Sequence, residues 1–158
     1  YFVDTMKSYD DKPFCNIATD DLGLESEEEK KETEAKQAED KELLDFVKET
    51  LGEQVASVRL SNKLVSSAVC LSTEGGVTLE MERYFRSMPG APTDIRAVRV
   101  LELNANHHAY QTMKEAFTAG DKDKAARIAK ILHAQALLIA GEPLEDPAAY
   151  SELVCTLI

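Results

Sequence analysis

The apolar content of the last two predicted helices constrains the fold more than any other feature. Residues 125–140 place large aliphatic side chains and several alanines around well over half of one helix. A helix that packs on one side of a core needs an apolar stripe only about 100° wide. Residues 147–158 add a second apolar helix, with Asp146 as its N-cap and Pro147 in its first turn. One small sheet is not expected to cover this pair.

These two helices therefore predict self-association. Two antiparallel helices from each chain form a four-helix bundle, and a C2 dimer completes it with a self-complementary patch. Burial against another part of a longer protein is the alternative, and a second copy is favoured over it. An obligate interface of this type buries ~2,000 Å² or more. The residues predicted to form it are Ile128, Ile131, Leu132, Gln135, Leu138, Ile139, Tyr150, Leu153, Val154 and Leu157.

The other segments predict an α+β fold, in which helices flank a small three-stranded sheet. Strands are expected over residues 55–61, 67–73 and 97–104, and further helices over 42–51, 77–88 and 108–120. Gly52, Gly120 and Gly141 suit helix ends, and Asp121 suits a helix start. We expect Asn104 or Asn106 to cap the helix that follows the third strand.

Composition divides the chain into three parts. Residues 24–41 are a charged run with almost no apolar side chains, typical of a solvated helix or a flexible linker. Residues 1–19 read as a short helix end and then a strand, and we interpret residues 1–23 as the end of a preceding domain. Residues 42–158 form the C-terminal dimerisation domain. Because the chain begins at Tyr1 without Met, we expect it to be a piece of a longer protein.

Charge and cysteine content exclude several classes of function. The 29 acidic and 18 basic residues give a net charge of −11, which disfavours nucleic acid and anionic membranes as partners. Cys15, Cys70 and Cys155 are widely spaced and form no C-x-x-C, so neither a disulfide framework nor a zinc site is expected. Buried free thiols in a cytoplasmic protein are the prediction.

The stretch EGGVTLEMERYFRSMPG (74–90) carries an apolar stripe at helical spacing. Its members are Val77, Met81, Tyr84, Phe85 and Met88. A stripe of this kind usually packs in a core. The Gly-Gly pair before it and the Pro-Gly pair after it are weak tethers, however, and they favour a helix that is held out for a partner.

Four stretches together resemble the C-terminal region of the heat shock protein 90 chaperones, and the bacterial type in particular. They are DDKPF (10–14), LGEQVASVRLSNKL (51–64), ELNANHH (102–108) and AQALLIAGEPLEDPAAY (134–150). Asn-Ala-Asn-His stands at 104–107 where the family usually has Asn-Pro-Asp-His, which leaves the helix entry less rigid. The acidic tail of eukaryotic cytosolic members is missing, so docking of tetratricopeptide co-chaperones is not implied.

The resemblance implies a constitutive homodimerisation module of an ATP-dependent chaperone that binds unfolded or partly folded client proteins. It also implies that ATP and Mg²⁺ bind in an N-terminal domain outside this sequence, so that the present chain needs no cofactor and is not itself an enzyme. The family's client-contacting helix matches residues 77–88. The implied client-binding residues are Val77, Met81, Tyr84 and Phe85, with Tyr1 as an aromatic position of the middle domain.

Two other interpretations stay open. The first is a purely structural homodimerisation domain that buries the 77–88 helix in its own core and contacts no client. The second, weaker one is a small enzyme that uses Cys70 or His107. His107 and His108 are adjacent, so their side chains diverge, and no third ligand stands at a suitable spacing. Gly75-Gly76 lacks the further residues of a phosphate-binding loop.

Overall fold

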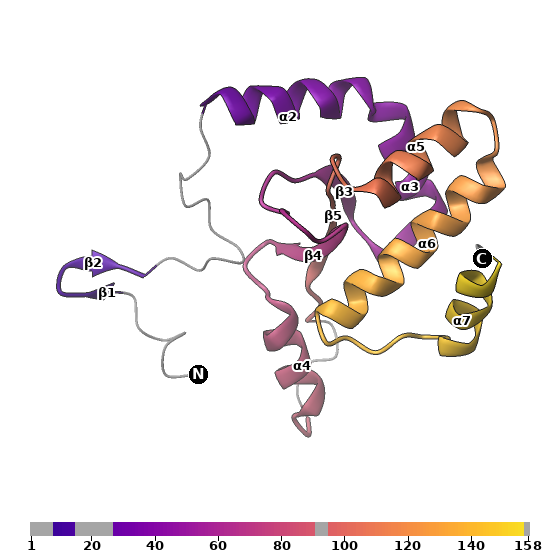
Figure 1. Cartoon of the computed structure of the whole chain (residues 1–158). Coiled ribbons are helices and arrows are strands. Elements are labelled where there is room, and N and C mark those ends of the chain that lie inside the picture. Colours follow the sequence, from indigo (N-terminus) through magenta and orange to yellow (C-terminus); the bar gives the residue numbers. More distant parts are fainter. Residues whose placement is uncertain (1–7, 15–26, 91–94, 157–158) are drawn as a thin grey trace.

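The computed structural model describes residues 8–14, 27–90 and 95–156. From residue 42 onward, the predicted order of helices and strands is confirmed among the described residues, whereas the hairpin before it is not predicted (Figure 1). A short hairpin comes first, formed by β1 (Ser8–Tyr9) and β2 (Lys12–Pro13). The helices are α2 (Glu27–Glu39), α3 (Lys41–Leu51), α4 (Leu79–Ser87), α5 (His108–Thr118), α6 (Lys122–Ile139) and α7 (Pro147–Cys155). The strands of the main sheet are β3 (Ser57–Leu60), β4 (Val69–Glu74) and β5 (Val98–Leu103), and the 3₁₀ turn η1 (Gly52–Gln54) follows α3.

The main sheet has the order β3-β5-β4. Strand β5 runs parallel to β3, with Val58 opposite Leu101, and antiparallel to β4, with Leu71 opposite Leu101. Helix α2 protects one edge, because the Gln37 side chain accepts a hydrogen bond from the Leu60 backbone N–H at 3.2 Å. The mixed fold with a three-stranded sheet agrees with the α+β prediction.

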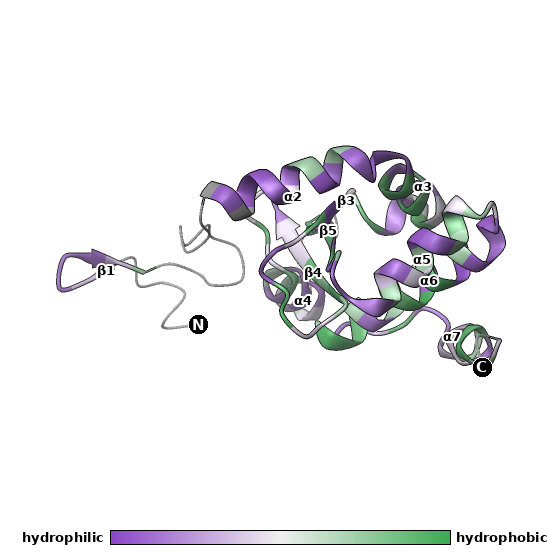
Figure 2. Ribbon diagram, turned by 45° about the horizontal axis from the view of Figure 1, so that its top comes forward, coloured by the Kyte–Doolittle hydropathy of each residue, from purple (hydrophilic) through white to green (hydrophobic). Residues whose placement is uncertain are grey.

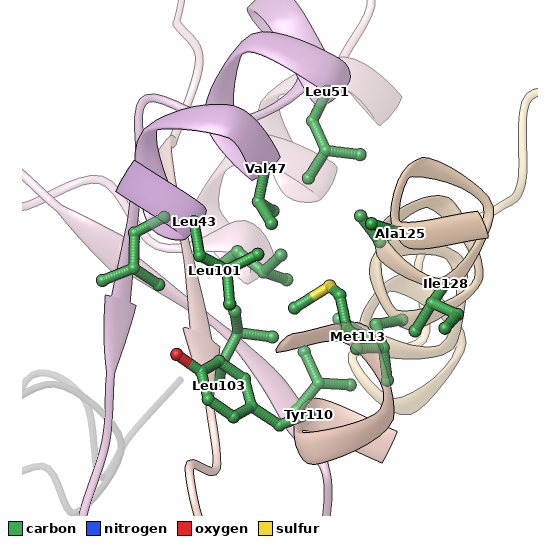
Figure 3. Packing of buried hydrophobic residues seen from close by; sticks show 14 of the residues in the cluster. Leu43, Val47, Leu51, Leu101, Leu103, Tyr110, Met113, Ala125 and Ile128 are labelled. Carbon is green, nitrogen blue, oxygen red and sulfur yellow. The ribbon is translucent and has the colours of Figure 1, made fainter. Parts of the chain in front are cut away.

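The core lies between this sheet and three helices (Figure 3). Helix α6 runs through its centre and packs against α3, α5 and β4. Figure 3 shows Val47 and Leu51 of α3 on the side that faces Met113 of α5 and Ala125 of α6. Helix α6 is therefore covered on several sides within one protomer.

The helix ends follow local sequence rules with one exception. Asp121 and Asp146 accept hydrogen bonds from the backbone N–H groups of Lys124 and Ala149, as predicted for N-caps. Gly52 and Gly141 adopt φ values of +60° and +71° just after α3 and α6, which only glycine tolerates easily.

The prediction that Asn104 or Asn106 caps α5 is wrong. The N-cap is His107, whose Nδ1 accepts a hydrogen bond from the Ala109 N–H at 3.1 Å. Asn104 is buried at the end of β5 and donates instead to the carbonyl oxygens of Leu64 and Ser67. Its Oδ1, the atom that would cap a helix, accepts a hydrogen bond from the Asn106 N–H at 3.0 Å instead, while its NH₂ group holds the β3–β4 loop.

The charged run forms helix α2, which is hydrophilic along its length (Figure 2). The interpretation as a solvated helix is thus confirmed over residues 27–39. Its junction with α3 is anchored at Asp40, which accepts a hydrogen bond from the buried Tyr110 hydroxyl at 2.7 Å. Lys114 lies 2.7 Å from the same carboxylate. Burial and this carboxylate raise the pKa of Tyr110, so the phenol stays protonated.

Candidate functional site

Helix α4 has a well-defined start. The Thr78 side chain accepts a hydrogen bond from the Met81 N–H at 3.2 Å, which caps the helix. Gly75 and Gly76 both have φ of +81°, so the chain turns sharply between β4 and α4. These local features determine where the 77–88 stripe begins. Whether its side chains are buried depends on tertiary contacts.

The structure leaves most of that stripe on the surface. Met81, Tyr84 and Met88 are 43%, 52% and 44% exposed, and Val77 and Phe85 are half-buried. The Tyr84 and Phe85 rings meet edge to face, with centroids 6.0 Å apart. The interpretation that buries this helix in the core of its own protomer is therefore wrong.

Helix α4 is held against Ala97 and strand β5 by a charged side chain. Its one buried residue is Glu82, which is 5% exposed. The Glu82 carboxylate accepts a hydrogen bond from the Ala97 N–H at 2.9 Å and lies 3.1 Å from the Arg99 guanidinium. It also pairs with Arg86 one turn along the helix. Burial alone raises the pKa of Glu82, but the Ala97 N–H and Arg99 outweigh burial, and the net pKa is lowered.

A second buried carboxylate extends this contact to the turn between α6 and α7. Glu142 is 5% exposed, and its oxygens lie 3.1 Å from Arg83 Nε and 3.7 Å from Arg99 Nη2. We call Glu82, Arg83, Arg86, Arg99 and Glu142 the α4 ion cluster. Through it, α4 is tied both to β5 and to the α6–α7 turn while its apolar side chains face outward.

A groove of about 830 Å³ lies between α4, α6 and α7. Its apolar lining includes Phe85, Met88, Ile95, Leu137, Leu144, Tyr150 and Leu153. His133 also lines it, is 5% exposed, and has a buried Nε2 atom without a hydrogen-bond partner. Burial, and secondly the Arg99 charge, lower the pKa of His133. The imidazole is thus kept neutral beside the groove.

The residues predicted for a dimer interface fall into three groups. Ile128, Ile131 and Leu132 are buried inside the protomer and have little surface left for a second copy. Leu138 and Ile139 are 50% and 64% exposed at the end of α6. Gln135, Tyr150, Leu153 and Val154 are half-buried, and α7 has no buried residue among those described. Leu157 and the predicted client residue Tyr1 lie outside the described residues.

Cys70 is half-buried and Cys155 is exposed, so the prediction of buried free thiols is wrong for both. Burial, aided by the neighbouring Glu102 carboxylate, raises the pKa of Cys70 to about 11, so the thiol is a poor nucleophile at neutral pH. His107 uses its Nδ1 to cap α5. Within residues 8–14, 27–90 and 95–156, no cluster of three His, Cys, Asp or Glu side chains is arranged to hold a metal ion. Neither Cys70 nor His107 is thus placed as an activated nucleophile or a free base.

Sequence reasoning found the stripe but missed the α4 ion cluster and the groove. Glu82 looked like one more surface charge in a helix that also carries Glu80, Arg83 and Arg86. Its position opposite Tyr84 is the available signal, because an exposed apolar face requires another face to hold the helix. No helix in the described part of the chain is long and apolar enough to cross a membrane.

Known proteins match the chain from end to end. Residues 1–158 match the family described as Hsp90 protein. Proteins named "Chaperone protein HtpG" from Halalkalibacterium halodurans, Bacillus velezensis and Bacillus subtilis are 40%, 38% and 35% identical to it. Each alignment covers all of this chain and 25% of the relative, so the chain spans about a quarter of the length of these curated relatives. The exposed α4 stripe and the matched motifs thus lie in a chain that belongs to the Hsp90 protein family.

Proposed function

We propose that this chain is the dimerising and client-contacting region of an ATP-dependent chaperone, and that α4 binds unfolded or partly folded proteins. The observation that carries the proposal is the orientation of α4, whose buried residue is a glutamate and whose methionine and tyrosine side chains face outward. An exposed apolar patch on a soluble protein usually marks a binding site.

The side chains of the stripe suit partners of varied shape. Met81 and Met88 are flexible and polarizable, so they adapt to different apolar surfaces. Tyr84 and Phe85 provide large contact areas and lose little conformational entropy on binding. A surface of this composition supports weak, broad recognition of exposed apolar segments rather than recognition of one sequence.

The proposed dimerisation is supported by apolar surface that is exposed at the end of α6 and along α7. Leu138 and Ile139 are exposed, and α7, whose sequence is largely apolar, buries none of its described residues. A second copy that packs its own α6 end and α7 against these residues would complete a four-helix bundle. Ile128, Ile131 and Leu132 would support such a bundle from the protomer core rather than at the interface.

A dimer would also strengthen client binding. A dimer carries two α4 stripes in one particle. Once one stripe has bound a client, contact of the second stripe with the same client is an intramolecular event, at an effective concentration of roughly millimolar order. Weak contacts then add up. A homodimerisation domain without client contact is the alternative, and the exposure of the stripe favours the chaperone function over it.

We assign the ATP chemistry of the chaperone to another part of the protein. Gly75-Gly76 forms a turn before α4 and is followed by Val77 and Thr78, without the lysine that a phosphate-binding loop needs. This turn therefore does not have the form of a phosphate-binding loop.

Client contact is tested with charge substitutions in the stripe. Met81→Asp and Tyr84→Asp should each weaken binding of a permanently unfolded, carboxymethylated model protein at least tenfold, measured by fluorescence anisotropy. Val65→Asp is the matched control, because Val65 is 94% exposed in the β3–β4 loop. Unchanged affinity in both stripe variants, with unfolding curves like those of the wild type, would leave the homodimerisation domain as the better function.

Dimerisation is tested at Leu138. Leu138→Asp places a charge in the proposed bundle and should shift the mass measured by light scattering after size exclusion from two chains to one. Val65→Asp should remain dimeric. A wild-type chain that elutes as a monomer at micromolar concentration would contradict the proposed bundle, whatever the outcome of the client experiment.

A further inference from the structure

We propose that Asp40 is a conformational latch between helices α2 and α3. In the latched state its carboxylate binds Tyr110 and Lys114 of α5, which holds α2 along the edge of the sheet. In the released state the same carboxylate caps the N-terminus of α3, and α2 swings away from the sheet. This inference goes beyond the proposed function, because it involves neither the α4 stripe nor the surface at the end of α6 and along α7.

The side-chain contacts that attach α2 to the sheet edge are polar. The Gln37 side chain accepts a hydrogen bond from the Leu60 N–H of β3, and the Thr33 hydroxyl donates to Asn62. No α2 residue whose side chain is described is buried, whereas Asp40, which follows the helix directly, is 7% exposed. Water can replace polar contacts of this kind at little net cost, so α2 can leave the edge without opening the core.

The backbone at Asp40 belongs to both helices. Its N–H donates to the Lys36 carbonyl oxygen at 2.9 Å in the last turn of α2, and its carbonyl oxygen accepts from the Leu44 N–H at 3.0 Å in the first turn of α3. Between these two bonds the chain changes direction, with φ of −90° and ψ of +12° at Asp40 (Figure 1). A continuous α-helix has ψ of about −42°. The angle between the two helices therefore depends strongly on the torsion angles of Asp40.

Asp40 stands at the N-cap position of α3, but its side chain makes no capping hydrogen bond. Aspartate is among the preferred N-caps, and its carboxylate would accept from the N–H of Glu42 or Leu43.

The residues of this chain that do cap a helix have a different backbone. They have ψ values from +70° to +162°, whereas Asp40 has +12°. These capping residues are Thr78, His107, Asp121 and Asp146. Capping of α3 and the present bend at Asp40 are therefore two separate backbone states, and the change from one to the other reorients α2.

Opposing contributions keep the two states distinct. Tyr110 is 1% exposed, and its hydroxyl donates to Asp40 Oδ2 at 2.7 Å, while Lys114 Nζ lies 2.7 Å from Oδ1. Release deprives this buried hydroxyl of its acceptor, which disfavours the released state. The new cap on α3 offsets part of that loss. The chain that precedes α2 must follow the N-terminal end of this helix, so the latch sets where that chain leaves the body.

A distance between α2 and α6 reports the state of the latch. Glu34→Cys and Lys122→Cys place spin labels at two exposed positions, one in α2 and one at the start of α6. The labels are introduced into the full chain after Cys15, Cys70 and Cys155 have been replaced by serine. The labelled chain is diluted with unlabelled chain, so that pulsed electron paramagnetic resonance measures distances within one protomer only.

Tyr110→Phe should shift the equilibrium toward a second distance by roughly tenfold, because it removes a hydrogen bond to a charged acceptor. Tyr84→Phe removes an exposed hydroxyl from α4 and is the matched control, which should keep the wild-type distance.

Two substitutions of Asp40 separate a latch from a simple anchor. Serine caps a helix, but its side chain is one bond shorter and does not reach Tyr110, so Asp40→Ser should give the second distance as a narrow peak. Alanine neither caps the helix nor binds Tyr110, so Asp40→Ala should give a broad distribution.

Urea unfolding curves identify the variants that are folded. Wild-type distances in folded Tyr110→Phe and Asp40→Ser would overturn the latch and make Asp40 a structural anchor only. Equally broad distributions in Asp40→Ser and Asp40→Ala would exclude the capped state, and the proposal with it. Asp40→Ser leaves Tyr110 in place, so it decides the question alone if Tyr110→Phe does not fold.

Discussion

Helices α4 and α6 both carry apolar side chains at helical spacing, yet those of α6 are largely buried in the core and those of α4 are largely exposed. Helix α6 buries seven residues, among them Ile128, Leu132 and Ala136, and is surrounded by α3, α5 and β4. Helix α4 buries only Glu82 and turns Met81 and Tyr84 outward. An amphipathic pattern thus shows that a helix has an apolar side, but the charges that anchor the other side decide whether the apolar side is covered.

The largest expected effect of this contrast is on stability. Leu132→Ala removes a side chain that is 2% exposed and should lower the free energy of unfolding by about 2–5 kcal/mol. Tyr84→Ala removes a larger side chain from the surface and should change it by about 0.5 kcal/mol or less. Urea unfolding followed by circular dichroism measures both values. Equal losses in the two variants would break the contrast between core and surface helix.

The next effect concerns the anchor of α4. Glu82→Gln keeps the shape of the side chain but removes the charge that Arg86 and Arg99 contact, so it should cost about 1–3 kcal/mol. The rate of backbone amide hydrogen exchange should increase most in α4, because the Glu82 carboxylate holds this helix to Ala97 and Arg99. Glu80→Gln, at an exposed position of the same helix, is the control. Faster exchange in α6 with α4 unchanged would place the anchor elsewhere.

The smallest expected effect is a pH dependence of the free energy of unfolding, caused by His133 of α6. A histidine in an unfolded chain titrates near ~6.5, and the pKa of buried His133 lies below its usual value. Between these two pKa values the unfolded chain binds more protons, so stability rises with pH and is lost as the pH falls below ~6.5.

His133→Gln should flatten the stability profile in this range, and His108→Gln, at an exposed position, should leave it unchanged. The profile comes from urea unfolding at several pH values. The lowered pKa of Glu82 acts in a separate range, because its contribution is lost only as the pH falls below ~4.5. A profile that His133→Gln leaves as steep as in the wild type would contradict the neutral, buried imidazole.

Local features of the fold could be predicted from the sequence because local chemistry determines them. The caps at Asp121 and Asp146 depend on the residue itself and the next helical turn. The Asn104 cap failed because tertiary contacts of its NH₂ group with Leu64 and Ser67 place Asn104 at the end of the sheet, and its Oδ1 accepts from the Asn106 N–H before the helix begins.

The surroundings of α6 and α4 could not be predicted in this way. The apolar circumference of α6 gave no indication that α3 and α5 would bury Ile128 and Leu132 within the protomer. The α4 ion cluster joins Glu82, Arg99 and Glu142 from three separate segments. Pairings of this kind depend on tertiary structure, and one-dimensional periodicity does not report them.

The ends of the α4 excursion meet in the sheet, where Glu74 of β4 pairs with Val98 of β5. The segment between these two residues therefore leaves and re-enters the sheet at one residue pair. The register of that pair is maintained by the other pairs between β4 and β5. Evolution can lengthen, shorten or rewrite such an insertion without rebuilding the scaffold, as long as the Glu82 and Ala97 tether is kept. The surface that α4 presents can thus change while the framework stays constant, and engineered grafts between Glu74 and Val98 should be tolerated for the same reason.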